Sequence, residues 1–326
     1  MILVCGGAGY IGSHMVAYLQ EKGEDVIVVD NLGTGHGKAV GYTKLYVGDL
    51  RDKAFLSDVF ASNKITSVID FAAYSLVGES MQNPLKYFNN NVSGTISLLE
   101  VMVEHGVKNI VFSSTAAVYG EPNKVPIPET LQKEPRNAYG ASKLMVENIL
   151  DWCDTCHGIK YGVLRYFNVA GAHLSGTIGE HHNPESHLIP IIAEVALGKR
   201  DKLTIYGNDY PTPDGTCIRD YIHVMDLVDA HYLTLKNIQK TNTSQTYNLG
   251  NGLGFSVKEI VDAFESVIGT PIPKEYGERR AGDPATLIAD YTEATTKLGW
   301  KQQYTDIKAI IESAWQWHKN NPEGYN

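Results

Sequence analysis

Short apolar runs alternate with longer amphipathic stretches through the first half of the chain. Apolar runs of this kind are typical of strands in a buried parallel sheet, and the stretches between them have a helical periodicity. Strands are predicted at residues 2–5, 26–30, 44–47, 67–71, 109–113 and 161–165, and helices at 10–22, 53–62, 84–105 and 138–157. The repeated strand–helix–strand order indicates an α/β fold with a doubly wound parallel sheet, whose ligands bind at the carboxyl ends of the strands.

The pattern changes after residue 168. Residues 171–186 and 207–215 are rich in Gly, Pro and polar residues, which predicts two loops. Helices are predicted among them at residues 187–198, 224–237, 257–268 and 307–318. We therefore expect a first domain over residues 1–167 and a smaller α+β C-terminal substrate lobe over residues 168–326, with a segment near 217–238 that packs back on the first domain.

Composition and charge exclude several classes of protein. Of the 326 residues, 43% are hydrophobic and 20% are charged, the balance of an ordinary globular protein. The net charge of −9 argues against a nucleic-acid partner, because a basic surface is needed to displace the counterions of phosphates. Met1 leads directly into an apolar strand, and the chain has neither a signal-peptide pattern nor an apolar run of membrane-spanning length. We expect a cytoplasmic protein without a membrane partner.

Neither disulfides nor a metal site are expected. The four cysteines, at positions 5, 153, 156 and 217, are scattered along the chain, and no second Cys or His pair stands at the spacing of zinc ligands. His181, His182 and His187 gather in a predicted loop, where we expect solvated side chains.

A glycine loop, Gly6-Gly-Ala-Gly9-Tyr-Ile-Gly12, joins the first predicted strand to the first helix. Glycines at this place allow a tight turn and let a pyrophosphate approach the exposed amides at the positive end of the helix. Asp30 ends the second strand, where a carboxylate accepts from ribose hydroxyls, and Asn31 follows it without a neighbouring arginine for a 2′-phosphate. The loop predicts a Rossmann-type domain that binds NAD rather than NADP. A glycine turn in a nucleotide-free domain is the alternative.

Tyr139 and Lys143 are the strongest candidates for catalysis. Four residues apart on a predicted helix, they share one face. A phenol has a pKa of about 10, and a neighbouring ammonium favours the phenolate, so the pair can move a proton on and off an alcohol or a sugar hydroxyl. Two further segments end strands at the same predicted cleft. The run Phe112-Ser-Ser-Thr115 ends the fifth strand and places hydroxyl groups there, and the run Arg165-Tyr-Phe-Asn168 ends the sixth.

Taken together, these motifs resemble the extended short-chain dehydrogenase/reductase family, and within it the NAD-dependent nucleotide-sugar epimerases. The matching stretches run from the glycine loop towards the tail: 6–14, 29–32, 77–80, 113–120, 139–147, 164–171, 206–211, 218–223 and 280–283. The resemblance implies an isomerase that converts UDP-galactose reversibly to UDP-glucose through a 4-keto sugar, with tightly bound NAD. It further implies a homodimer, in which the predicted helices 84–105 and 138–157 are long enough to supply the interface.

The resemblance also assigns roles to residues. Tyr139 is the general base and acid on the C4 hydroxyl, Lys143 tunes it and holds the nicotinamide ribose, and Thr115 replaces the usual serine. These three and the following residues are expected to contact the cofactor: Gly6, Gly9, Tyr10, Ile11, Gly12, Asp30, Asn31, Asp49, Leu50, Phe71, Ala72, Asn90, Tyr166 and Phe167. Besides Thr115 and Tyr139, the expected substrate contacts are Asn168, His187, Leu188, Thr204, Tyr206, Arg219, Arg280, Asp283 and Leu287.

Three positions depart from the family's pattern. Ser75 replaces a lysine found in many relatives, and His187 replaces an asparagine found in some. Leu287 occupies a sugar-pocket position that is tyrosine in some relatives and a smaller residue in others. Because a smaller side chain leaves room for a 2-N-acetyl group, we expect some activity on UDP-N-acetylhexosamines.

Other functions remain as alternatives. A nucleotide-sugar 4,6-dehydratase of the same family typically carries Asp-Glu after the threonine, but Ala116 and Ala117 follow Thr115 here. Another NAD-dependent epimerase of the family acts on a different nucleotide sugar. A non-catalytic NAD sensor is a third possibility, since a fold does not fix a function, although a sensor has no need of Tyr139 and Lys143.

Overall fold

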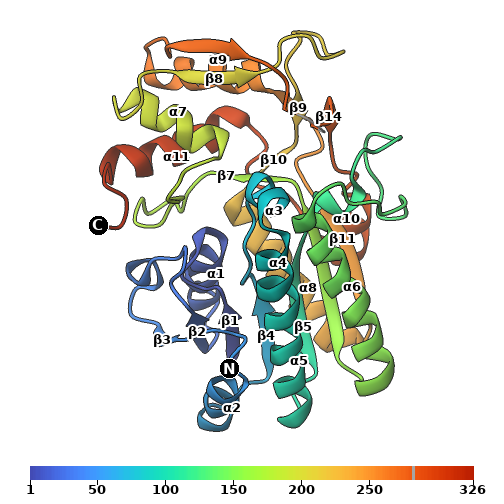
Figure 1. Ribbon diagram of the computed structural model, residues 1–326. Helices are drawn as coiled ribbons and strands as arrows, with labels where there is room; N and C mark the ends of the chain where they lie inside the picture. Colours follow the sequence, from blue (N-terminus) through green and yellow to red (C-terminus); the bar gives the residue numbers. More distant parts are fainter. Residues whose placement is uncertain (281–282) are drawn as a thin grey trace.

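The centre of the molecule is a parallel sheet that is buried on both faces. In the computed structural model, which describes residues 1–280 and 283–326, seven strands pair in the order β11-β6-β5-β4-β1-β2-β3 (Figure 1). Their bounds are β1 (Ile2–Cys5), β2 (Val26–Asp30), β3 (Lys44–Val47), β4 (Ser67–Asp70), β5 (Asn109–Thr115), β6 (Lys160–Tyr166) and β11 (Gln245–Leu249). The predicted doubly wound α/β fold is confirmed.

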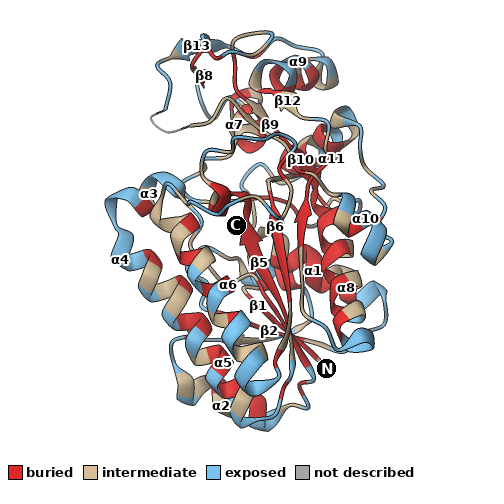
Figure 2. Ribbon diagram, turned by 90° about the vertical axis from the view of Figure 1, so that its right-hand side faces the viewer, coloured by how far each residue is buried: buried red, intermediate tan, exposed pale blue. Residues whose placement is uncertain are grey.

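Alternating apolar side chains explain why the sheet needs helices on both sides. Along β1, Ile2 and Val4 belong to one hydrophobic cluster, whereas Leu3 and Cys5 belong to the other. Figure 2 shows the buried strands between the two helical layers. The first cluster is covered by α1 (Tyr10–Glu21) and α8 (Val224–Thr241), and the second by α2 (Lys53–Ser62), α5 (Gly94–Glu104) and α6 (Ala138–His157).

The helix predicted at residues 84–105 is not regular. It consists of α4 (Pro84–Tyr87), a π-helical segment (Phe88–Ser93) and α5, and it is preceded by α3 (Val77–Gln82), which the sequence pattern did not predict. Within the π-helical segment Asn91 is buried, and its side chain bonds to the backbone of Tyr74 and to Ser142 of α6. The widened turn therefore places an amide where it can join the loop after β4 to α6.

The second half of the chain builds a smaller lobe and also returns to the sheet. In the first half, by contrast, two short 3₁₀ segments lie at Gly37–Val40 and Ala116–Tyr119. The lobe has its own core, to which the helices α7 (Leu188–Ala196), α9 (Val257–Ile268) and α11 (Ile307–Asn320) contribute. Helix α10 (Thr292–Leu298) packs instead against α8 and β11, on the first cluster of the sheet. The short strands of the lobe are β7 (Asn168–Ala170), β8 (Leu203–Tyr206), β9 (Ile218–Arg219), β10 (Tyr221–His223), β12 (Phe255–Ser256), β13 (Lys274–Gly277) and β14 (Thr286–Leu287).

Two segments connect this half to the first. The first is α8, which contacts α1, β5 and β6. Strand β11, which was not predicted, pairs in parallel with β6 and forms the edge of the sheet. In the part of the chain that the structure describes, no helix is both long and apolar enough to cross a membrane.

Candidate active site

The glycine loop leaves the start of α1 open to a ligand. Gly6 has a φ of +70°, and a Cβ there would lie 2.7 Å from the amide nitrogen of Ala72, so only glycine fits. A Cβ on Gly12 would lie 2.1 Å from the carbonyl oxygen of Gly6. The N-cap residue Gly9 gives α1 no side-chain cap, which leaves its first-turn amides to a phosphate. The predicted residues Tyr10 and Ile11 lie in this first turn.

The end of β2 carries a carboxylate that can accept hydrogen bonds from ribose hydroxyls. The two carboxylate oxygens of Asp30 accept hydrogen bonds from the amides of Ala8 (2.9 Å) and Leu32 (2.8 Å), which fix the orientation of the side chain. Asn31 donates to Asp49 across the adjoining loop (3.1 Å).

An arginine does approach this edge, although the sequence suggested none. Arg51 binds Asp49 through Nε (2.8 Å) and Nη2 (2.7 Å), and this ion pair holds the pKa of Asp49 well below its usual range. The guanidinium is thus engaged in a bidentate pair rather than presented to a 2′-phosphate, which favours NAD over NADP.

The predicted catalytic residues lie together at the ends of β5 and β6. Thr115 is the last residue of β5 and hydrogen-bonds the phenol of Tyr139, near the start of α6. One turn further, Lys143 donates from Nζ to the carbonyl oxygen of Ser113 (2.8 Å). The Ser113 hydroxyl in turn hydrogen-bonds the hydroxyl of Tyr166 at the end of β6. Ser113, whose hydroxyl was expected at this cleft but without a specific role, therefore links the lysine to Tyr166.

Burial controls the protonation of this group. Burial raises the pKa of Tyr139 to about 12, whereas the hydrogen bond with Thr115 lowers it by a smaller amount. Burial lowers the pKa of Lys143 to about 8, while the negative charges of Asp70 and Glu147 act in the opposite direction. Tyr139 is therefore a proton donor at neutral pH, and positive charge close to the phenol is needed before it can accept a proton.

A buried ion pair fixes α6 on the sheet. Arg165 binds Glu147 with Nε on one carboxylate oxygen (2.9 Å) and Nη2 on the other (2.7 Å). Ser114 adds a hydrogen bond to Glu147 (2.6 Å), and Tyr119 accepts one from Arg165 (2.8 Å). The two charged side chains are only 4% and 5% exposed, so each depends on the other for its neutralisation.

The other predicted cofactor residues lie around the same edge. Phe71 and Ala72 directly follow β4, and Leu50 is buried in the loop after β3. Asn90 donates to its neighbour Asn91 (3.0 Å). Phe167 joins β6 to β7 and packs in a small apolar cluster with Leu287 and others. These positions agree with the expected ring of contacts, and the individual roles remain predictions.

The predicted substrate residues form two groups in the smaller lobe. In the first, Arg219 binds Asp283 through a salt bridge, and β9 pairs with β14 so that Arg219 lies opposite Leu287. In the second, the guanidinium of Arg280 lies 4.2 Å from the centre of the Tyr206 ring. The middle two residues of the 280–283 motif lie outside the described residues.

A buried aspartate directly follows Arg219 in the chain, and the sequence analysis included it only within the stretch 218–223. Asp220, fully buried, accepts hydrogen bonds from the amides of Gly252 and Ala289 (both 3.0 Å) and of Asn251. It thereby ties three segments together directly beside the arginine. Asn168 also belongs here, because its amide donates to the carbonyl oxygen of Asp220 (2.9 Å).

Three predicted substrate residues remain. Thr204 on β8 donates to Glu275 (3.2 Å). Leu188 begins α7, and His187 before it is bonded to Glu185 (3.0 Å). The histidines of this loop, which were expected to be solvated, are partly exposed, with the His187 side chain at 42% and that of His182 at 25%. The Glu180 and Glu185 side chains beside them are only 6% and 4% exposed.

Comparison with known proteins gives a consistent result. Residues 2–250 match the family described as the NAD dependent epimerase/dehydratase family. A UDP-glucose 4-epimerase of Lacticaseibacillus casei is 57% identical over 325 residues, which cover 99% of this chain and 98% of that protein.

Solved structures agree with the sequence relatives. A crystal structure of a UDP-glucose 4-epimerase, 56% identical, has a TM-score of 0.98 and covers 100% of this chain and 99% of its own. The UDP-glucose 4-epimerase of Bifidobacterium longum in complex with NAD⁺ and UDP is 43% identical, with a TM-score of 0.94 and 99% coverage of both chains.

Replacement of Glu147 by Gln should destabilise the protein by about 3 kcal/mol, because Arg165 would keep its charge in a buried site without a counter-charge. Urea unfolding followed by circular dichroism measures the loss. The control is Glu104→Gln on α5, which removes an exposed ion pair with Lys53 and should cost less than about 1 kcal/mol. Equal losses in the two variants would contradict the importance of the buried pair.

Proposed function

The chain belongs to the NAD dependent epimerase/dehydratase family, and we infer that it is an isomerase, a UDP-glucose 4-epimerase that interconverts UDP-galactose and UDP-glucose with bound NAD. One observation carries this inference. Thr115, Tyr139 and Lys143 lie together at the carboxyl ends of the strands, the same edge of the sheet at which the glycine loop lies. Close relatives over the full chain length carry the same name.

The cofactor site fits NAD. The uncapped amides of α1 suit the pyrophosphate, Asp30 suits the adenosine ribose, and Lys143 and Tyr166 lie where the nicotinamide ribose would be held. Bound NAD⁺ supplies the hydride acceptor at C4 of the sugar and later the hydride donor. Because the reaction has no net redox change, the protein can retain the cofactor between turnovers.

The protein's own part in the reaction is a proton transfer at the C4 oxygen. Tyr139 takes the hydroxyl proton while the 4-keto sugar forms, and returns it to the same oxygen after the sugar has turned over. We propose that Lys143, one turn further along α6, provides the positive charge that makes the phenolate accessible when substrate and cofactor are bound. Thr115 holds the phenol by a hydrogen bond.

The UDP portion needs a fixed anchor while the keto sugar rotates. We propose that Arg219 and Arg280 bind the diphosphate, since guanidinium groups offer paired donors to phosphate oxygens. Support comes from the rigid setting of Arg219 beside Asp220 and opposite Leu287.

The alternatives are less favoured. A 4,6-dehydratase needs an acid and a base after the threonine, whereas Ala116 and Ala117 form an apolar turn there. A non-catalytic sensor would not require Tyr139 or the buried Lys143, whose desolvation costs stability.

We propose that the sugar pocket also accepts UDP-N-acetylhexosamines. Leu287 and Phe167 both pack against a small apolar cluster that includes Tyr119 and Ile127, and the leucine side chain is smaller than that of tyrosine. This leaves space for an acetamido group next to C2.

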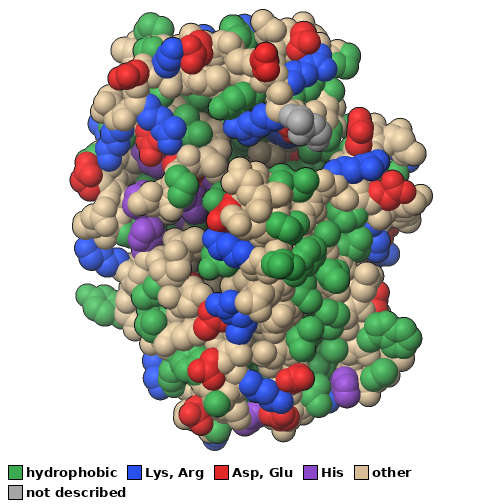
Figure 3. Space-filling model, viewed as in Figure 1, with side chains coloured by type: hydrophobic (Ala, Val, Ile, Leu, Met, Phe, Trp, Pro, Cys, Tyr) green, Lys and Arg blue, Asp and Glu red, His purple; other side chains and the backbone are tan. Residues whose placement is uncertain are grey.

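We further propose a cytoplasmic homodimer formed through α5 and α6. Large apolar side chains are exposed on these two helices, Ile96 on α5 and Met145 and Trp152 on α6, and Trp152 is 70% exposed. Figure 3 shows hydrophobic side chains gathered over α6 and the neighbouring part of α5. Exposed apolar surface of this kind is typical of protein interfaces.

Tyr139→Phe should retain the bound nucleotide but lose at least ~10²-fold in kcat, because the ring stays in place and the proton carrier is lost. Turnover from UDP-galactose and the nucleotide released on denaturation are measured together. Tyr42→Phe, at a fully exposed tyrosine, is the matched control. Turnover like that of the unaltered protein would remove Tyr139 from the mechanism.

Leu287→Tyr should reduce the ratio of kcat/KM for UDP-N-acetylglucosamine to that for UDP-glucose by about tenfold, because the larger ring fills the space for the acetamido group. The two substrates are compared with the same preparation. An unchanged ratio would refute the argument from side-chain size.

Trp152→Glu should convert the dimer to a monomer, since a charge would be buried in an apolar interface. Light scattering after size exclusion gives the mass, and Leu174→Glu alters another exposed leucine outside the proposed interface as a control. A mass that is the same for all three proteins would contradict the proposed interface.

A further inference from the structure

The loop before α7 brings four potential metal ligands together. Glu180, His182, Glu185 and His187 each offer one donor atom, and every one of these atoms lies within 4.8 Å of the other three. The cluster lies close to the start of α1, where the ring of Tyr10 packs edge-on against that of His182 with their centres 6.5 Å apart. None of these residues takes part in the proton transfer proposed above.

The separations of the donor atoms match a tetrahedral site. Nδ1 of His187 lies 3.0 Å from Glu185 and 3.2 Å from Glu180, and Nδ1 of His182 lies 3.4 Å and 3.5 Å from the same two carboxylates. Four ligands at ~2.0–2.1 Å from a zinc ion in a tetrahedron are about 3.3 Å from each other. Both histidine nitrogens therefore lie close to the same oxygen of Glu180, and each lies close to one of the two oxygens of Glu185, at about the spacing that a shared central ion requires.

Burial and charge also favour a cation. The Glu180 and Glu185 side chains are only 6% and 4% exposed, and two carboxylates so close together repel each other when buried. A divalent cation with two glutamates and two neutral imidazoles gives a net charge of zero. Two protonated histidines would balance the charge equally well, so charge alone does not decide.

His182 distinguishes the two arrangements. Its Nδ1 atom is buried and, among the described residues, has no hydrogen-bond partner, although it faces two carboxylates. A protonated imidazole would be expected to direct this N–H at one acceptor, because an unpaired buried donor is costly. A nitrogen held between two carboxylates, at 3.5 and 3.4 Å, is instead in the position of a metal ligand.

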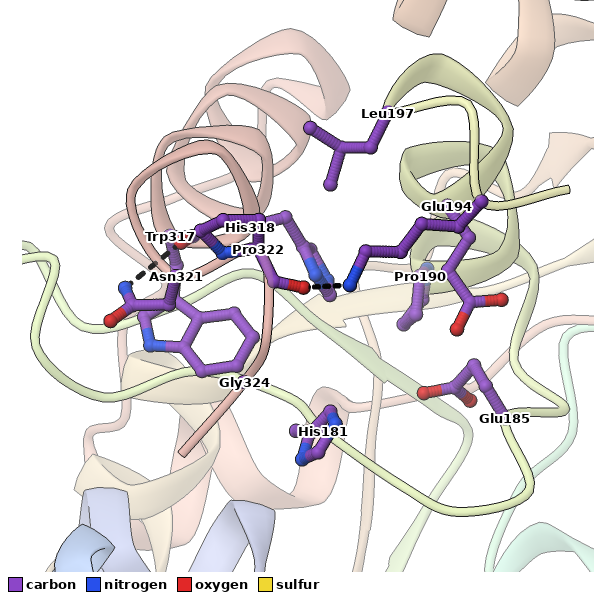
Figure 4. A pocket seen from close by; sticks show the side chains of 11 residues that line it. His181, Glu185, Pro190, Glu194, Leu197, Trp317, His318, Asn321, Pro322 and Gly324 are labelled. Carbon is purple, nitrogen blue, oxygen red and sulfur yellow. Dashed lines mark hydrogen bonds between the residues drawn. The ribbon is translucent and has the colours of Figure 1, made fainter. Parts of the chain in front are cut away.

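The surrounding structure holds the ligands in place. The amides of Ser186 (2.8 Å) and His187 (2.9 Å) both donate to Glu185, which orients its carboxylate. At the start of the loop, the hydroxyl of Tyr325 bonds to the amide and the carbonyl of Gly179 (both 2.9 Å). Figure 4 shows His181 and Glu185 on this loop, lining a pocket to which α11 contributes Trp317.

We propose that Glu180, His182, Glu185 and His187 form a structural site for one Zn²⁺ ion. Two imidazole nitrogens and two carboxylate oxygens in a four-coordinate arrangement suit zinc, whereas Mg²⁺ and Ca²⁺ take six or more oxygen ligands. All four positions are occupied by the protein, so the ion has a structural role. It fixes the loop that leads into α7.

The test uses the full chain with its bound nucleotide, purified without a polyhistidine tag and treated with EDTA. After dialysis against ZnCl₂ and removal of free metal, plasma mass spectrometry should find about one zinc per chain. Zinc at a hundredfold excess over its dissociation constant should raise the midpoint of thermal unfolding by about 5 °C. Co²⁺ in place of zinc should give the visible absorption of a tetrahedral site.

Two variants and a control make the result specific. His182→Gln and the double variant His182→Gln/Glu185→Gln should lose the zinc and the thermal shift, whereas His157→Gln, at an exposed histidine at the end of α6, should keep both. Single and double variants are both used in case the double variant does not fold. The proposal is overturned if the unaltered protein binds no zinc, or if the His182→Gln variant binds as much as the His157→Gln control.

Discussion

The buried ion pair between Arg165 and Glu147 holds the helix of the active site against the sheet, and the geometry of the site depends on it. Arg165 lies near the end of β6, and Glu147 lies on α6 about two turns after Tyr139. Neither charge can be separated from the other without a large loss of stability, because both are desolvated. Tyr166 follows Arg165 directly, and Lys143 precedes Glu147 by one turn. The Arg165–Glu147 ion pair therefore also sets the positions of Tyr166 and Lys143.

Burial serves the chemistry as well as the fold. The low-dielectric surroundings raise the pKa of Tyr139, which keeps the phenol protonated, and lower the pKa of Lys143. The negative charges of Asp70 and Glu147 favour the charged lysine. The carboxyl ends of β5 and β6 bring these groups to the edge where the glycine loop opens. The second half of the chain closes the same edge, since Asp220 ties together the segments that surround Arg219.

Local patterns in the sequence were sufficient for much of this structure. The strands β1, β2 and β3 and the helices α2, α6 and α9 have the predicted bounds. The glycine loop and the Tyr139–Lys143 pair could be recognised because each is contained in a few neighbouring residues. Strand β11 was missed, since Gln245–Leu249 is short and lacks a continuous apolar run. Contacts between distant segments, such as Arg165 with Glu147, have no local signal, and nothing in the sequence around His182 and His187 indicated that two buried glutamates lie beside them.

The most direct test of the proposed function is to incubate the purified protein with UDP-galactose, without added NAD, and to measure the UDP-glucose formed. The account predicts conversion, because the cofactor is retained and is regenerated in each turnover. Absence of conversion, even when NAD is supplied, would contradict the proposed C4 epimerisation of these sugars and leave only the fold and the family established.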